Sequence, residues 1–210
     1  MSRTIPLLLC LLFTCSCQAP GRKHVAALVE QLVSPIGPPG PDITDYNGGQ
    51  ADEKKLEASL KALFEGYEHP QVAQARAKLV AMGTPIFPEL VRHLQDQRYC
   101  YSFCYAQWVN HSVGETIEHM MAEVVRGQFE PYGYKWRKNG HGSNGQPSFD
   151  QMLQEIGAEK YAEHVKGMTQ RSAEKEYVEW YLQQEKKYGF TSSEQEEQIV
   201  APCLNRLSQL

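Results

Sequence analysis

Apolar residues recur at helical spacing in several segments of this chain, and each of these segments ends at a glycine. A separation of three or four residues places the apolar side chains on one face of an α-helix, and glycine commonly follows the last helical turn. The pattern predicts an all-α fold. The stripes are Leu56, Leu60, Leu63 and Phe64 before Gly66; Val72, Ala75, Leu79 and Met82 before Gly83; and Val113, Ile117, Met120, Met121, Val124 and Val125 before Gly127.

Helix starts can be recognised in the same sequence. Ser112 is followed three residues later by Glu115, and Ser148 by Gln151, which is the spacing of a capping box at a helix N-terminus. Thr84 precedes a proline and predicts an N-cap with proline at the first helical position. The helix that it would open carries Ile86, Phe87, Leu90, Val91 and Leu94.

The C-terminal part continues the helical pattern. Its stripes are Tyr161, Val165 and Met168; Ala173, Tyr177, Trp180, Tyr181 and Tyr188; and Ile199, Cys203, Leu204 and Leu207. Pro202 is expected to break or restart the last of these helices, because proline lacks a backbone N–H. The segment from Tyr99 to Val109 stays open: alternating aromatic residues favour a strand, but Ala106 to Trp108 suit a helix equally well.

Residues Ala75 to Leu90, with the sequence ARAKLVAMGTPIFPEL, resemble a HEAT-type helical repeat. The resemblance consists of a first helix, a Gly-x-Pro turn and a second helix that opens with proline and leucine. It covers about one repeat, Pro70 to Asp96, and implies stacked helix pairs that bind other proteins. No second clear copy follows. We therefore expect a short HEAT-like α-α superhelical domain over residues 52–210, extended by irregular helices.

The N-terminus predicts export. The apolar run Ile5 to Phe13 has the length of a signal-peptide core and is too short for a membrane-spanning helix, which needs about 20 residues. The following FTCSC, with Ser16 before Cys17, resembles a bacterial lipobox and implies a signal peptide over residues 1–16 and lipidation of Cys17. The alternative is a plain secreted protein. Gln18 resembles outer-membrane sorting, so we expect an outer-membrane lipoprotein that faces the periplasm and touches the membrane through its anchor only.

Residues 17–51 are expected to tether the folded domain to this anchor. His24 to Val33 has the pattern of a short amphipathic helix, and Ser34 to Gln50 is rich in proline and glycine, which preclude regular structure. Two other stretches, Pro131 to Tyr134 and Glu179 to Phe190, resemble exported bacterial lipoprotein-like proteins. That resemblance implies no activity.

The composition of the chain narrows the classes of function that it can have. The 210 residues, 41% of them hydrophobic, suffice for one globular domain of ordinary size. A net charge of −4 argues against a nucleic-acid binder, because phosphate backbones are bound by clustered positive charge. The sequence contains no P-loop, dinucleotide fingerprint, nucleophile elbow or His-Glu-x-x-His motif, and it implies no cofactor.

His111, Glu115 and His119 are four residues apart, and on one helix such residues can share a metal ion. The capping box argues against a metal site, because it places His111 before the helix and engages Glu115 with the backbone. Glu115, Glu118 and His119 also fall opposite the apolar stripe at about 100° per residue, so we expect a solvated face. A metal-dependent envelope hydrolase that uses these three residues is the least favoured function.

Three cysteines besides Cys17 lie beyond the predicted signal peptide: Cys100, Cys104 and Cys203. In an oxidising compartment Cys203 could form a disulfide with Cys100 or Cys104. Cys100 and Cys104 would lie about 13 Å apart on a strand and could not pair with each other. The alternative is that all three are small buried residues. A Cys104 nucleophile that works with His111 or His119 is the weaker interpretation.

The stretch Pro131 to Phe149 is the candidate binding loop. Aromatic faces beside cations can stack sugars and hold anions. The alternative is that the aromatic residues pack onto the helices while the basic residues are solvated. The candidate contact residues are Tyr132, Tyr134, Trp136, Arg137 and Lys138.

These observations favour a non-catalytic protein of the cell envelope. We expect a tethered protein-interaction or scaffold module with an envelope protein as its partner, acting through a helical groove or the candidate binding loop. A cell-wall glycan-binding module is the alternative.

Overall fold

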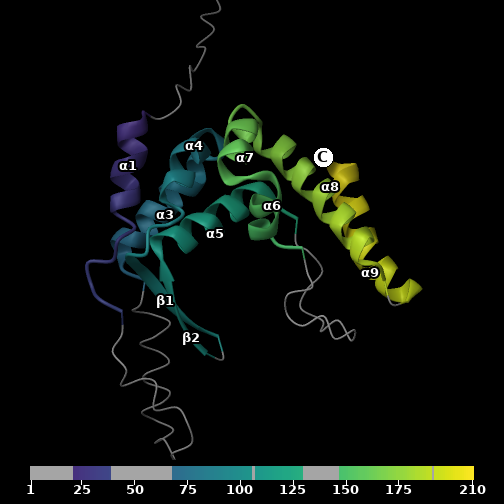
Figure 1. Cartoon of the computed structure of the whole chain (residues 1–210), viewed down its shortest axis with the longest axis horizontal. Helices are drawn as coiled ribbons and strands as arrows, with labels where there is room; N and C mark the ends of the chain where they lie inside the picture. Colours follow the sequence, from purple (N-terminus) through teal and green to yellow (C-terminus); the bar gives the residue numbers. More distant parts are fainter. Residues whose placement is uncertain (1–20, 39–67, 106, 130–146, 191) are drawn as a thin grey trace, which may run out of the picture.

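A computed structural model describes residues 21–38, 68–105, 107–129, 147–190 and 192–210 of the chain (Figure 1). This part is mostly helical, so the predicted all-α class is confirmed, with one two-stranded sheet added. None of its helices is long and apolar enough to cross a membrane. The predicted signal peptide, the lipidation site Cys17 and the stripe Leu56 to Phe64 lie outside the described residues.

The elements follow one another along the chain in a simple order. The helices are α1 (Arg22–Glu30), α3 (Pro70–Met82), α4 (Phe87–Leu90), α5 (Val113–Arg126), α6 (Phe149–Ile156), α7 (Ala158–Val165), α8 (Gln170–Tyr188) and α9 (Ser193–Gln209); the 3-10 turns are η2 (Thr84–Ile86) and η3 (Val91–His93); the strands are β1 (Tyr99–Tyr105) and β2 (Gln107–Ser112).

Helix α5 forms the centre of the core. Its predicted apolar stripe is buried, and α3, α6, α8 and the β1–β2 hairpin contact it. The predicted capping box is confirmed: the Glu115 N–H donates to Ser112 Oγ at 3.2 Å, and the Ser112 N–H donates to Glu115 Oε2 at 2.8 Å. The helix ends at Gly127, as predicted.

Helix α1 belongs to the core and not to a tether. Val25, Leu28 and Val29 share one face of this helix and are buried where it contacts α3 and α4, and Leu32 follows them into the core. The predicted tether over residues 17–51 is therefore wrong for this segment. A short amphipathic stretch has the same pattern whether or not a partner surface covers it, and here α3 and α4 provide that surface.

Helix α3 starts at Pro70 and ends at Gly83, as predicted. The helix expected after it is only partly α-helical, since the chain forms η2, α4 and η3 in succession. Pro85 and Pro88 lack the N–H groups that would continue a regular ladder. Thr84 is not an N-cap either: its side chain is buried and donates to the carbonyl oxygen of Met168 at 2.9 Å. The HEAT-type resemblance stays a prediction.

The segment left open by the sequence is an antiparallel hairpin of β1 and β2. Tyr101 pairs with His111 and Phe103 with Val109, and the register shifts between Tyr99 and Tyr101. The strands of the hairpin lead away from the helices (Figure 1). At its base, the Ser34 N–H donates to the carbonyl oxygen of Tyr99 at 3.0 Å.

Helices α8 and α9 run antiparallel at the C-terminal side of the molecule (Figure 1). The aromatic stripe of α8 is largely buried, with Tyr177 and Tyr181 in the core, while Tyr188 is exposed. Helix α9 runs through Pro202 without interruption, so the predicted break is wrong. Ile199 and Cys203 face the core, but Leu204 is 53% exposed.

Helix α6 confirms one half of its predicted capping box. The Gln151 N–H donates to Ser148 Oγ at 3.2 Å. The Gln151 side chain does not return to the cap; it donates to Glu155 at 3.0 Å and to the Tyr188 hydroxyl at 2.6 Å. This residue therefore ties α6 to the end of α8.

Candidate interaction surface

The β1–β2 hairpin is the longest stretch of the described chain without a formal charge. From Tyr99 to Ser112 it contains no Lys, Arg, Asp or Glu, whereas 22% of the whole chain is charged, a frequency at which 14 residues would hold about three. The stretch holds five aromatic residues besides His111. Depletion of charge and enrichment in aromatic residues distinguish the centres of protein interfaces from other surface.

The backbone geometry of the hairpin also favours an interface with another chain. The described sheet consists of β1 and β2 alone, and a strand at the edge of a sheet is a template for another chain. Natural proteins protect such edges with lysine, proline or a bulge. This hairpin has neither lysine nor proline, and its irregularity lies at the base, between Tyr99 and Tyr101. The half nearer the turn therefore carries none of these three devices.

The base of the hairpin is held by a stack of three rings from three elements. Tyr101 of β1 stacks on His111 of β2 with ring centroids 4.9 Å apart, and His111 meets the edge of His119 of α5 at 5.0 Å. His111 is buried, with 7% of its surface exposed, while His119 is exposed. The guanidinium of Arg76 also lies over the Tyr101 ring, 5.9 Å from its centroid.

This stack contains the predicted metal candidates, and the structure gives them a packing role. Glu115 is engaged in the capping box, and its Oε2 lies 3.9 Å from His111 Nδ1. Within the described segments, no three His, Cys, Asp or Glu side chains lie close enough to hold a metal ion. Glu115 and His119 are exposed, as expected, whereas Glu118 is partly buried.

Burial sets the protonation state of the stack. It lowers the pKa of His111, although Glu115 acts in the opposite direction. The pKa of His119 is also lowered, first by desolvation beside β2 and then by His111 itself. Both imidazoles are therefore held in their neutral form at pH 7.

Cys100 and Cys203 are free thiols in the structure. Cys100 and Cys203 are both buried, and Cys203 Sγ donates to the carbonyl oxygen of Ile199 at 3.2 Å. The predicted disulfide of Cys203 is therefore not formed, because each thiol is enclosed within its own part of the core. Burial raises the pKa of each to about 11, which makes both poor nucleophiles. The side chain of Cys104 lies outside the described atoms.

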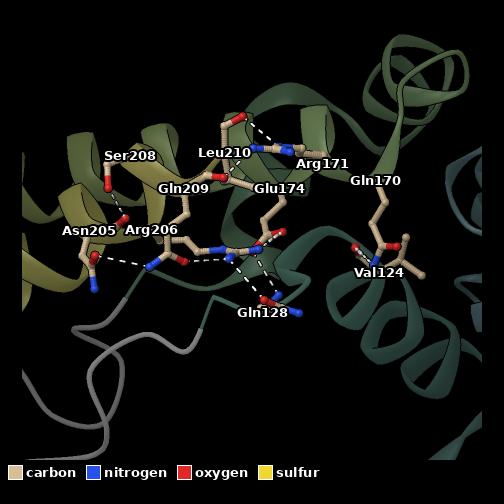
Figure 2. A network of polar contacts seen from close by, with 10 residues as sticks. All are labelled: Val124, Gln128, Gln170, Arg171, Glu174, Asn205, Arg206, Ser208, Gln209 and Leu210. Carbon is tan, nitrogen blue, oxygen red and sulfur yellow. Dashed lines mark hydrogen bonds and ion pairs between the residues drawn. The ribbon is translucent and has the colours of Figure 1, made fainter.

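A second candidate site is an open hollow beside α9. It has a volume of about 270 Å³ and is lined by Gln128, Phe129, Pro202, Asn205, Arg206 and Gln209. Figure 2 shows the polar network behind it: Arg206 of α9 forms a two-pronged ion pair with Glu174 of α8, at 2.6 and 2.8 Å. The remaining guanidinium nitrogen donates to Gln128 and Gln209 at 3.3 and 3.0 Å.

This network joins three helices, which explains why Arg206 and Glu174 are placed here. The Gln128 N–H, just beyond α5, donates to Glu174 Oε1 at 3.0 Å. Gly127 permits the approach, because a Cβ at this position would lie 2.3 Å from Glu174 Oε2. All three guanidinium nitrogens already have partners within the protein, so the hollow presents amide groups rather than a free cation.

The sequence predicted neither of these two surfaces. The predicted binding-loop residues Tyr132, Tyr134, Trp136, Arg137 and Lys138 lie outside the described residues. The hairpin was not singled out as a surface, although its lack of charge could have revealed it. The hollow joins residues far apart in sequence, and no local pattern marks it. No family model, curated protein or solved structure matches this chain.

Proposed function

We propose that this protein is a tethered interaction or scaffold module of the cell envelope, and that the β1–β2 hairpin is its contact surface. The observation that carries the proposal is the uncharged, aromatic hairpin that leads away from the helical body (Figure 1). The described helices would serve as the support that holds this surface in place. The N-terminal signal and Cys17 would hold the module at the membrane, as an outer-membrane lipoprotein facing the periplasm.

The partner that fits this surface is an envelope protein with an apolar or extended segment. A charge-free surface gains from burial of apolar area without the cost of desolvating ions. An additional strand could also continue the two-stranded sheet, which is a common mode of peptide recognition. The titratable residues of the described site support this interpretation, since Glu115 and the pair of Arg206 and Glu174 are engaged in structural bonds.

Photo-crosslinking in the producing cells tests the proposal. A photoreactive phenylalanine analogue replaces Trp108 in the hairpin, and in a matched variant it replaces the exposed Leu204 of α9. We expect a discrete crosslinked envelope protein from position 108 and none from position 204. Equal crosslinking from both positions, or from neither, would contradict the assignment of the hairpin.

Glycan binding is the second candidate function, and the hollow beside α9 supports it. Gln128, Asn205 and Gln209 present amides that can bond to sugar hydroxyls, and Phe129 immediately precedes the segment with the candidate loop. Sedimentation of the protein with isolated cell wall tests this function. Loss of co-sedimentation in both Asn205→Ala and Trp136→Ala would favour the glycan, whereas unchanged sedimentation in both would remove it.

A further inference from the structure

We propose that mild acid releases the β1–β2 hairpin from α5, through the paired imidazoles of His111 and His119 at its base. This release by acid rests on the proposed role of the hairpin as the contact surface. It would make the surface responsive to pH. The proposal stands on the arrangement of rings between three elements, all within the described residues.

His111 is the residue on which the hairpin is seated. Its ring lies between Tyr101 and His119, at 4.9 and 5.0 Å, and 7% of its surface is exposed. A proton added to this ring would place a charge in a largely desolvated position. A proton on both imidazoles would place two positive charges about 5 Å apart, and because His119 is exposed, this repulsion is screened and adds to the larger cost of charging the buried His111.

The charged groups that face the two imidazoles act in opposite directions, and Glu115 favours the protonated form of both rings. From α5, Glu115 lies 3.9 Å from His111 Nδ1, but its carboxylate already accepts from the Ser112 N–H and hydroxyl, at 2.8 and 3.1 Å. Also from α5, Arg126 acts on His119 as a like charge and favours the neutral ring.

Helix α3 adds a cation, Arg76, and the residue Glu68 just before this helix is the acidic partner of that cation. Arg76 of α3 lies over Tyr101 and opposes protonation of His119. Glu68, just before α3, binds Arg76 through two contacts of 2.9 and 3.1 Å and so balances that cation rather than the imidazoles. The Tyr101 hydroxyl stays neutral, because burial raises its pKa.

The direction of the effect follows from these contacts. The pKa of each imidazole is lowered in the folded protein, so the seated hairpin has its full stability above the ordinary value of about 6.5 and loses it as the pH falls below that value. Separation of β2 from α5 would hydrate His111 and increase its distance from His119. Acid therefore favours the released hairpin.

Residue-resolved amide hydrogen exchange of the full-length chain tests this proposal. Between pH 7.5 and 5.5 we expect exchange in Gln107–Ser112, corrected for its intrinsic pH dependence, to rise relative to exchange in α8, because the pKa of each imidazole is lowered in the folded protein. His119→Gln is expected to reduce this rise, because it removes the second charge. The exposed His24→Gln should leave it unchanged.

The outcomes separate this proposal from the proposed function. Parallel exchange of the hairpin and α8 at both pH values would overturn the proposal, as would a rise that persists unchanged in His119→Gln. Far-UV circular dichroism at pH 7.5 checks that the variants are folded. The exchange experiment uses purified protein without a partner. If acid releases the hairpin in that experiment but position 108 gives no crosslink in cells, only the proposed function is rejected and the pH response of the hairpin stands.

Discussion

At the scale of single residues, Gly114 is the point where α5 comes closest to a neighbouring segment. Its N–H donates to the carbonyl oxygen of Asp96 at 2.9 Å. A Cβ at this position would lie 2.2 Å from the carbonyl oxygen of Leu94 and 2.8 Å from its carbonyl carbon. Because these atoms belong to the backbone, they cannot move aside as a flexible side chain could.

Gly114→Ala should therefore destabilise the protein, even though alanine is the better helix former. The expected loss is about 1–3 kcal/mol in the free energy of unfolding, as for other overpacking substitutions. Urea unfolding measures it. Gly167→Ala is the matched control, since no atom lies within 4 Å of a Cβ there, and it should leave the stability unchanged. Equal stability of the two variants would show that α5 and the Leu94 segment are not in this contact.

The two described cysteines make a second prediction at this scale. Cys100 and Cys203 are buried thiols with a pKa raised to about 11, so alkylation should be slow in the native protein and complete in denaturant without a reducing agent. Mass spectrometry of the modified peptides identifies each site. Modification of the Cys203 peptide only after reduction would instead show a disulfide.

Hydroxyl residues show why sequence reasoning succeeds at one residue and fails at another. Ser112 caps α5 as predicted, because its partner Glu115 is three residues away and the spacing itself carries the signal. Thr84 has an equally good local signature, but its partner is the carbonyl oxygen of Met168. A bond over 84 residues leaves no pattern in the sequence.

At the scale of elements, the pair of Glu174 and Arg206 is the main polar tie between α8 and α9. The Glu174 side chain is 4% exposed, and it also accepts from the Gln128 N–H. Glu174→Gln preserves the shape but leaves the guanidinium of Arg206 without a charged partner. Because Glu174 is buried and Arg206 would lose its only charged partner in this network, we expect the Glu174 variant to lose clearly more stability in urea unfolding than an exposed pair contributes.

Glu179→Gln is the matched control for this prediction. It removes the same charge from the same helix, but its partner Lys175 is 4.0 Å away and both side chains are about half exposed. Exposed pairs at this spacing contribute about 0.3–0.5 kcal/mol, so the control should change little. If both variants lose the same stability, the pair of Glu174 and Arg206 in Figure 2 does not hold the two helices together.

Helices with a strong local signal could be predicted, and elements defined by distant partners could not. The apolar stripe of α5 and the glycine after α3 were sufficient to place those helices. The local sequence of α1 predicts a tether. The surface that covers this helix is formed by α3 and α4, and such distant partners leave no signal in the helix itself. Strand pairing decided the segment from Tyr99 to Val109, where the local preferences were balanced.

At the scale of the whole molecule, the structure separates a supporting body from a surface. The buried apolar residues of α1, α3, α4, α5, α6, α7 and α8 belong to one core cluster, and the hairpin extends from it. The sequence predicts an interaction module with its contact in the segment Pro131 to Phe149. The uncharged hairpin is the surface that the described geometry supports, since composition and topology coincide there.

Hydrogen exchange with mass spectrometry, measured on the full-length chain with and without an extract of envelope proteins, tests the central claim most directly. We predict that the extract slows exchange in peptides covering Tyr99–Ser112 and leaves peptides of α9 unchanged. Slower exchange in peptides of α9, together with unchanged exchange in the hairpin, would contradict the account. It would indicate that the partner binds at the hollow beside Arg206.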